Sequence, residues 1–460
     1  MNAFLVRVRT ARYLRRGLVL CTVAVVAAAV ASMGTAATKD KPGSGLSPQV
    51  ALDWNSNAVD AVRAARTMDG QPPGAAARPL YQAEGIIYLA YVQAAVYDAV
   101  TKIAHRYEPY HRFSAGGGNA SAEAAVVAAS YNTLTFYLGD PSGVLATKYA
   151  ASIAALPADK ATARGIAVGE AAASDIEALR AGDGRNAPTD VYGAIGPVVA
   201  GAWQVVPPSV VAQTPWVAFM RPFMMQDPSQ FRAPPPPALT SAQYAKDFNE
   251  TALWGSSTSA PPFRTPAETA IAVFWNGNTI NQQNQAYRDV AVQHSMDLVD
   301  TVHLMAMGEV SAADGAIACF DSKYHYLAWR PYTAIRNADI DGNPATTAIP
   351  GWTPLLPTPN HPEYPSAHGC ITSAFTRAIA AALGTNNIDL TLWGASAIGG
   401  PNNVTQHFAT VQDLQTQLVD ARVWGGLHWR NSDVVGEAVG NAMSDWTLAR
   451  YFQPVGKDDN

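Results

Sequence analysis

Alanine-rich segments with helical spacing, each bounded by a capping residue or a glycine or proline stop, run through most of this 460-residue chain. Ile86, Leu89 and Val96, for example, recur at intervals typical of a helix that buries one face. The expected helices cover residues 47–66, 80–103, 120–138, 143–156, 160–180 and 241–253, and the pattern resumes from about residue 266. Alternating β-branched runs are nearly absent, so we expect an all-α fold of antiparallel bundles and no sheet.

A proline-rich stretch interrupts this helical pattern. Pro207-Pro208, Pro222, Pro228 and Pro234–Pro237 disfavour helix and favour extended or turn structure. We therefore predict a connector on the surface over residues 205–240. It would join an N-terminal helical bundle over 38–204 to a C-terminal helical bundle over 241–456, which carries the catalytic site.

The first 37 residues have the composition of an export signal. Arginines between Arg7 and Arg16 precede an apolar stretch over 17–32, and small residues follow at 35–37. The pair Arg15-Arg16 also resembles a twin-arginine signal. We expect an exported protein, periplasmic or secreted, although an uncleaved membrane anchor is the alternative.

The charge and hydropathy of the remaining chain limit its partners. The formal net charge is −5, so no basic field predicts nucleic-acid binding. No later stretch has the unbroken apolarity of a membrane span, so we expect no membrane contact after signal cleavage. The sequence does not fix the oligomeric state, and a homodimer stays open.

The first of three short polar segments is Lys323 with Arg330-Pro331. If one helix carries both cations, their spacing of seven places them on nearly the same face, about 10 Å apart along the axis. Pro331 disfavours helical geometry at Arg330, so we expect the helix to end there. An arginine at such an end is well placed to bind an anion, although two cations on a solvated face are the simpler alternative.

The second segment, Pro365-Ser366-Ala367-His368-Gly369, precedes an amphipathic pattern that ends at Leu383. Ser366 stands where a helix N-cap belongs, and free N–H groups at a helix start attract anions. His368 in the first turn could then act on that anion as an acid or base. The alternative is a plain cap followed by a surface histidine.

The third segment contains Arg422 and His428. Six residues turn a regular helix by roughly 240°, so one straight helix cannot direct both side chains inward. Gly425-Gly426 lies between them and can break the helix, which would let both face one pocket. A helix–loop–helix junction with a core histidine is the alternative reading.

Together the segments supply three cations, a hydroxyl beside backbone N–H groups and two histidines. This set suits a tetrahedral oxyanion whose central atom is bonded to a histidine. On these residues the chain resembles the vanadium-dependent haloperoxidases, which share a site with the phosphatidic-acid-phosphatase-type acid phosphatases. Residues 52–55 (LDWN) and 94–99 (AAVYDA) also look like bacterial members of that family.

The resemblance implies a fold of two four-helix bundles, with the oxyanion site in the C-terminal bundle. It implies vanadate as the cofactor, with phosphate able to occupy the same site, and hydrogen peroxide, halide and small organic molecules as substrates. The implied roles of the site residues are vanadium binding by His428, acid–base catalysis by His368, polarisation of peroxide by Lys323, and contacts to the oxyanion from Lys323, Arg330, Ser366, Ala367 and Arg422.

The resemblance also suggests a halide preference. His361 stands five residues before Ser366, where chloroperoxidases of the family tend to have an aromatic residue and bromoperoxidases a histidine. We therefore expect bromide and iodide to be favoured over chloride. Phe320 is expected to form an apolar wall of the same pocket, although His361 could also be a loop histidine without such a role.

Some positions depart from the family pattern or stay open. Ala367 replaces a usual glycine, and Ser432 stands where an aspartate is common, with Asp433 one residue later, so the partner that orients His428 is uncertain. Cys319 and Cys370 could form a disulfide or remain buried thiols.

Two other functions use the same residues. In an acid phosphatase, His428 would attack phosphorus and His368 would protonate the leaving group. A protein that binds oxyanions without turnover is less favoured, because anion binding alone requires only cations and amides and not two histidines.

Overall fold

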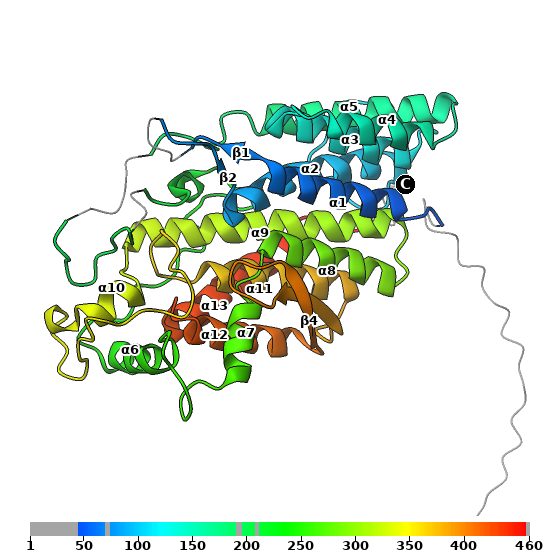
Figure 1. The fold of residues 1–460 in the computed structure, drawn as a ribbon. Coiled ribbons are helices and arrows are strands. Elements are labelled where there is room, and N and C mark those ends of the chain that lie inside the picture. Colours follow the sequence, from blue (N-terminus) through cyan, green and yellow to red (C-terminus); the bar gives the residue numbers. More distant parts are fainter. Residues whose placement is uncertain (1–44, 70–73, 190–195, 208–210, 457–460) are drawn as a thin grey trace, which may run out of the picture. The chain divides into compact units, whose positions relative to one another are not determined.

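The structure, a computed structural model, describes residues 45–69, 74–189, 196–207 and 211–456. Residues 41–460 form one compact unit (Figure 1). The expected export signal lies outside the described residues and remains a prediction.

The N-terminal half forms a helical layer close to the segments predicted for it. Its helices are α1 (Gln49–Ala64), α2 (Gln82–Ala104), α3 (Ala122–Leu138), α4 (Val144–Ala154) and α5 (Lys160–Leu179). Ser121 and Asp159 cap α3 and α5, because each side chain accepts a hydrogen bond from a backbone N–H of the first turn. α3 and α5 pack so closely that a Cβ on Gly165 or Gly169 would lie within 2.5 Å of a backbone oxygen of α3 or of its N-cap.

The predicted connector is not a surface segment throughout. It contains the 3₁₀ helix η1 (Pro215–Phe219), whose Trp216 is 1% exposed, and Met220 is fully buried. Asp314 in the core accepts hydrogen bonds from the backbone N–H groups of residues 223–225 at 2.7–3.0 Å. This part of the expectation was wrong, because apolar side chains between the prolines hold the segment against the core.

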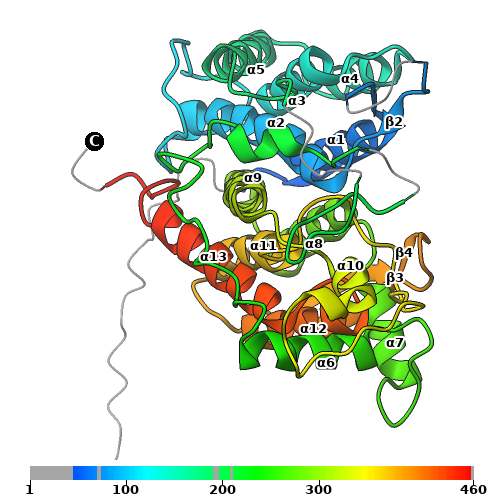
Figure 2. The ribbon, with the colours of Figure 1, turned by 90° about the vertical axis from the view of Figure 1, so that its left-hand side faces the viewer.

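The C-terminal half contains the remaining helices. These are α6 (Ala242–Trp254), α7 (Pro266–Phe274), α8 (Thr279–Gln293), α9 (Leu298–Tyr326), α10 (Pro331–Arg336), η2 (Ala338–Ile340), α11 (Ala367–Leu383), α12 (Val411–Trp424) and α13 (Arg430–Leu448). The 29-residue helix α9 lies at the centre, between α2 on one side and α11 on the other (Figure 2). One hydrophobic core extends from Trp54 in α1 to Met443 in α13 and includes most of α9.

Two small hairpins are the only sheets among the described residues, where no sheet was expected. β1 (Arg66–Thr67) pairs with β2 (Arg78–Pro79), and β3 (Leu390–Ala395) pairs with β4 (Asn402–Phe408), both antiparallel. Inward-facing Leu390 and Leu392 pack on the side of the core that includes α8. The all-α fold class is confirmed with these additions.

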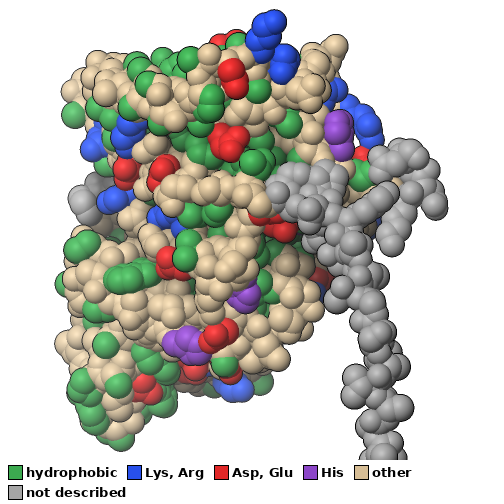
Figure 3. Space-filling view, turned by 90° about the vertical axis from the view of Figure 1, so that its right-hand side faces the viewer, with side chains coloured by type: hydrophobic (Ala, Val, Ile, Leu, Met, Phe, Trp, Pro, Cys, Tyr) green, Lys and Arg blue, Asp and Glu red, His purple; other side chains and the backbone are tan. Residues whose placement is uncertain are grey.

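Two properties of the fold bear on contacts with membranes and nucleic acids. Among the described residues, α2 is the one helix long and apolar enough to cross a membrane, and 89% of that stretch is buried inside the protein. On the face drawn in Figure 3, acidic and basic side chains of the described residues are interspersed, and no continuous basic field is visible.

Candidate active site

The structure brings the three predicted segments together around one cavity of about 310 Å³. Six of the nine residues singled out for this site line the cavity: Phe320, His361, Ala367, His368, Arg422 and His428. Lys323, Arg330 and Ser366 are fully buried in the wall behind it. The N-terminus of α2, from Tyr81 to Ala83, and Gln213-Thr214 of the connector complete the lining. Both halves of the chain therefore build the cavity.

The first segment does not form the single helix that was expected for Lys323 and Arg330. Helix α9 ends at Tyr326, and Leu327 adopts a left-handed conformation at its C-cap. Pro331 opens α10 at its first position, and Arg330 is the extended N-cap. The prediction that Lys323 and Arg330 share one helix face was wrong, because proline at N1 begins a helix as readily as it stops one.

Lys323 faces a loop and not the open cavity. Its Nζ donates to the backbone oxygens of Pro362, Glu363 and Pro365 at 2.9, 3.0 and 2.5 Å. These contacts use all three N–H donors of the ammonium group. Lys323 therefore fixes the loop that carries His361 and leads to Ser366.

Arg330 contacts two histidine rings. Its Nη1 lies 3.1 Å from Nε2 of His428, and its Nη2 lies 2.9 Å from Nδ1 of His361. A guanidinium group can only donate, so Nε2 of His428 carries a lone pair and the proton of the neutral ring is on Nδ1. Nδ1 of His361 also lies 3.2 Å from the backbone oxygen of Pro362, so the contacts of this second ring do not select one tautomer.

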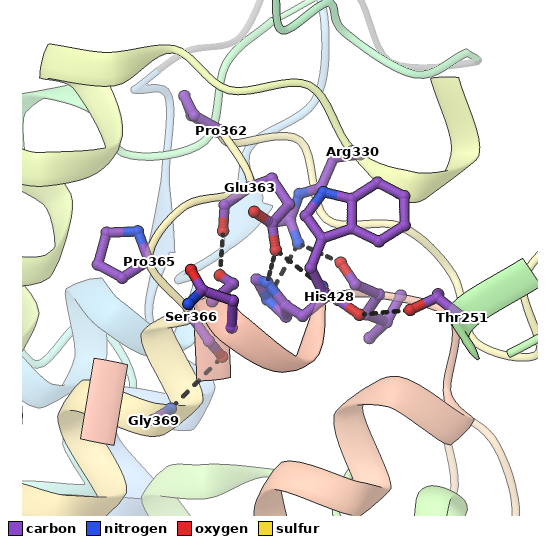
Figure 4. Close-up of polar contacts among 12 residues, drawn as sticks. Thr251, Arg330, Pro362, Glu363, Pro365, Ser366, Gly369 and His428 are labelled. Atoms are coloured by element: carbon purple, nitrogen blue, oxygen red, sulfur yellow. Dashed lines mark hydrogen bonds and ion pairs between the residues drawn. The ribbon is translucent and has the colours of Figure 1, made fainter. Parts of the chain in front are cut away.

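Glu363 is the site residue that the sequence analysis missed. Its Oε1 accepts a hydrogen bond from Nδ1 of His428 at 2.8 Å and from the backbone N–H of Trp429 at 3.2 Å (Figure 4). The carboxyl group is fully buried, and burial raises its pKa to about 7. A single glutamate in a proline-rich loop has no distinctive spacing, so no sequence signal pointed to it.

The second segment has the predicted geometry. Ser366 is the N-cap of α11, and its Oγ accepts from the backbone N–H of Gly369 at 3.4 Å. The N–H of Ser366 donates to the backbone oxygen of Ser432, which ties the start of α11 to α13. His368 lies in the first turn, and burial and then the charge of Arg422 hold its pKa well below the usual range. His368 is therefore neutral near pH 7 and available as a base.

The third segment breaks at its glycines as predicted. Helix α12 ends at Trp424, and Gly426 adopts a left-handed conformation with φ of +73° before α13 begins. Arg422 Nη1 makes one long contact with the backbone oxygen of Trp275 at 3.5 Å, and its Nε has no hydrogen-bond partner among the described residues. Among the three cations, Arg422 thus has donors left for an anion in the cavity.

The question of the His428 partner is resolved in favour of Glu363. Ser432 Oγ contacts the backbone oxygen of Glu363 at 3.4 Å and does not reach the ring. Asp433 is fully buried, close to Ser366 and Arg422. Cys319 and Cys370 are buried free thiols in this structure, so the disulfide alternative is not realised.

The electrostatics of the site favour an anion. Burial lowers the pKa of Lys323 to about 8 and the pKa values of Arg330 and Arg422 to about 10. Two buried carboxyl groups, Glu363 and Asp433, face these three cations, and burial raises the pKa of both. The site therefore carries excess positive charge in a poorly solvated interior, which a bound oxyanion would neutralise.

Comparisons with known proteins agree with the family resemblance seen in the sequence. Residues 303–457, which include all three segments, match the family model of the VCPO second helical-bundle domain. The chain is similar to vanadium-dependent haloperoxidases. It is 22% identical over 263 residues to vanadium chloroperoxidase of Curvularia inaequalis, a match that covers 44% of this chain and 42% of that protein. The matched region is thus less than half of that relative's length.

Solved haloperoxidase structures share the fold over most of this chain. A bacterial vanadium-dependent iodoperoxidase superposes with a TM-score of 0.69 at 21% identity, over 88% of this chain and 98% of the other. The holo form of a bacterial vanadium-dependent chloroperoxidase gives a TM-score of 0.64 at 20% identity, over 83% and 94% of the two chains.

The residues present fit vanadate as the group implied by these relatives. His428 offers a ring nitrogen with its lone pair, and Arg422 and the N-terminus of α11 offer donors for oxygens. A metal oxyanion bound to a histidine requires this combination of one nitrogen ligand and several N–H donors.

Proposed function

We propose that this protein is a vanadate-dependent haloperoxidase, which oxidises halide with hydrogen peroxide to hypohalous acid. The observation that carries the proposal is the hydrogen-bond chain from Arg330 through His428 to Glu363. It fixes the ring of His428 in the tautomer whose Nε2 can bind a metal centre. The neutral His368 lines the same cavity.

Each residue has a defined task in this reaction. When bound, vanadate would supply a Lewis acid that makes peroxide electrophilic while staying pentavalent. Arg422 and the backbone N–H of Ala367 would hold the oxyanion, and His428 would hold the metal through Nε2. His368 would accept a proton from entering peroxide and return it to the leaving oxygen, which departs as water. The overall balance is hydrogen peroxide, halide and one proton to hypohalous acid and water.

We propose bromide or iodide as the preferred halide. His361 and Phe320 both line the cavity, with ring centroids 5.3 Å apart. A polar imidazole beside an apolar wall suits a large, weakly hydrated halide. His361→Phe should therefore shift the ratio of chloride to bromide oxidation, and an unchanged ratio would contradict this preference.

An acid phosphatase is the second candidate, because phosphate is also a tetrahedral oxyanion. The Nε2 lone pair of His428 could attack phosphorus, and His368 could protonate the leaving group. The extent of the fold shared with haloperoxidase structures, including the N-terminal half that lines the cavity, favours the peroxidase. Simple oxyanion binding without turnover is less favoured, because it leaves both histidines without a task.

The two activities can be measured on one sample. Mature protein, with and without orthovanadate, would be assayed for bromination of monochlorodimedone with peroxide and bromide, and in parallel for hydrolysis of a phosphate ester. Vanadate-dependent bromination is the expected result. Ester hydrolysis that vanadate inhibits, without bromination, would make the protein a phosphatase.

A further inference from the structure

A second cavity, of about 330 Å³, is lined by Glu363, the hydrogen-bond partner of His428. Oε1 of Glu363 bonds to His428, which lines the first cavity, whereas Glu363 itself lines the second. The rim is formed by the exposed residues Pro235 and Ala238. The second cavity therefore extends from the protein surface to a buried carboxyl group.

Aromatic rings form most of its inner wall. Tyr244 and Trp429 meet edge to face, with ring centroids 5.8 Å apart, and Tyr326 and Tyr364 do the same at 5.8 Å. The hydroxyl groups of Tyr326 and Tyr364 donate to backbone oxygens of residues 233 and 234 at 2.7 and 2.8 Å, which fixes both rings. Trp329 adds a fifth, buried ring.

The charged groups of this lining have a single sign. Asp247 and Glu363 are 2% and 0% exposed, and none of the lining residues is lysine, arginine or histidine. Asp247 accepts only from neutral donors, the amide of Gln243 at 2.9 Å and the N–H of Asn431 at 3.3 Å. Two buried carboxyl groups thus face a cavity that contains no cationic side chain.

The lining also has an unused hydrogen-bond acceptor. Oε2 of Glu363 is buried and has no hydrogen-bond partner among the described residues. A buried acceptor without a donor is costly, so a ligand that brings N–H groups would be stabilised there. Aromatic rings also attract a cation that lies over their faces.

We propose that the second cavity binds a small protonated organic amine. Its ammonium group would donate to Glu363 and lie near Asp247, and its carbon skeleton would pack against the five rings. The proposal needs no assumption about the reaction in the first cavity. Glu363 already faces Lys323 and Arg330 on its other side, whereas a neutral aromatic molecule would gain the same apolar contacts but would leave Asp247 without a counter-charge.

Calorimetric titration of the purified protein distinguishes binding of a protonated amine from binding of a neutral aromatic molecule. Benzylammonium chloride and benzyl alcohol have nearly the same shape and differ in charge at neutral pH, and saturating phosphate would keep the first cavity occupied. Benzylammonium should bind at least about tenfold more tightly than benzyl alcohol, which corresponds to one charge-assisted contact.

Two variants test whether benzylammonium binds in the second cavity. Asp247→Asn keeps the side-chain shape and should weaken benzylammonium binding about tenfold, whereas Asp339→Asn, the same change at an exposed position outside the cavity, should not. Tyr326→Leu removes one ring and should also weaken binding, which provides a second test if Asp247→Asn fails to fold. Equal binding of the amine and the alcohol, no binding of either, or benzylammonium binding unaffected by both variants would overturn the proposal.

Discussion

Nδ1 of His428 lies 2.8 Å from Oε1 of Glu363, and both side chains are fully buried. This contact orients the ring and keeps the proton on Nδ1, so that Nε2 keeps its lone pair. Carboxylate groups orient metal-binding histidines in this way in many metalloproteins, and losing such a partner typically weakens metal binding. Glu363 is therefore a positioning residue, which acts through His428.

The first prediction concerns this carboxyl group. Glu363→Gln should weaken orthovanadate binding roughly 10–100-fold, because an amide can also donate to Nδ1 and so permits the wrong tautomer. Calorimetry with orthovanadate measures the effect. Glu437→Gln, a partly buried glutamate on α13 outside the site, serves as the control. Equal affinity in the Glu363 variant and wild type would exclude a positioning role.

The second prediction concerns the cation with unused donors. Arg422→Gln should reduce the affinity for inorganic phosphate by at least about tenfold, because hydrogen bonds to charged groups contribute about 1.5–3 kcal/mol. Equilibrium dialysis with phosphate is the measurement. Arg377→Gln, which removes an arginine paired with Asp445 at the surface, should leave phosphate binding unchanged. A larger loss in the Arg377 variant would contradict the assignment.

The third prediction tests the junction between α12 and α13. Gly426→Ala places a Cβ within 2.5 Å of the backbone oxygen of Gly255 and within 3.0 Å of Pro354, in addition to the cost of a positive φ. Gly384 also has a positive φ, of +67°, but open space around it. Urea unfolding should show a loss of roughly 1 kcal/mol for Gly384→Ala and a clearly larger loss for Gly426→Ala. Similar losses of unfolding free energy in the two variants would show that the close approach of Gly426 to Gly255 and Pro354 does not affect stability.

The fourth prediction is a pH dependence of stability. Burial raises the pKa of Glu309 in α9 to about 8, and its Oε2 has no hydrogen-bond partner among the described residues. The folded state therefore holds a proton that the unfolded chain releases near pH 4.5. Protonated Glu309 therefore stabilises the folded state fully below the unfolded pKa of 4.5. This stabilisation is lost as the pH rises to about 8, by up to about 1.4 kcal/mol per pH unit.

Glu309→Gln should remove this loss. Urea midpoints measured at pH 5.5 and 8.5 should fall less with pH in the variant than in wild type, while Asp60→Asn, at an exposed position, should follow wild type. A wild-type midpoint that does not fall over this range would show that Glu309 is not held in its neutral form.

The sequence predicted the parts that depend on local signals. Capping residues and glycine or proline stops located most helices to within a few residues, as with Ser366 before α11 and Gly384 after it. The glycine break between Arg422 and His428 was also found, because six residues of regular helix cannot direct both side chains inward.

The parts that depend on long-range packing were not predictable. Lys323 uses its donors on a loop about 40 residues away, and Glu363 gains its role only because α13 begins beside it. Likewise, the connector is held by Asp314, about 90 residues further along the chain. These contacts have no periodicity or motif of their own, so only the folded chain reveals them.

Titration of orthovanadate into wild-type protein and into His428→Ala tests the central claim most directly. Wild type should bind one vanadate per chain in competition with phosphate. His428→Ala should lose most of that affinity, because Nε2 of His428 is the proposed ligand of the metal. Equally tight binding by His428→Ala would contradict the assignment of His428 as the residue that holds vanadium.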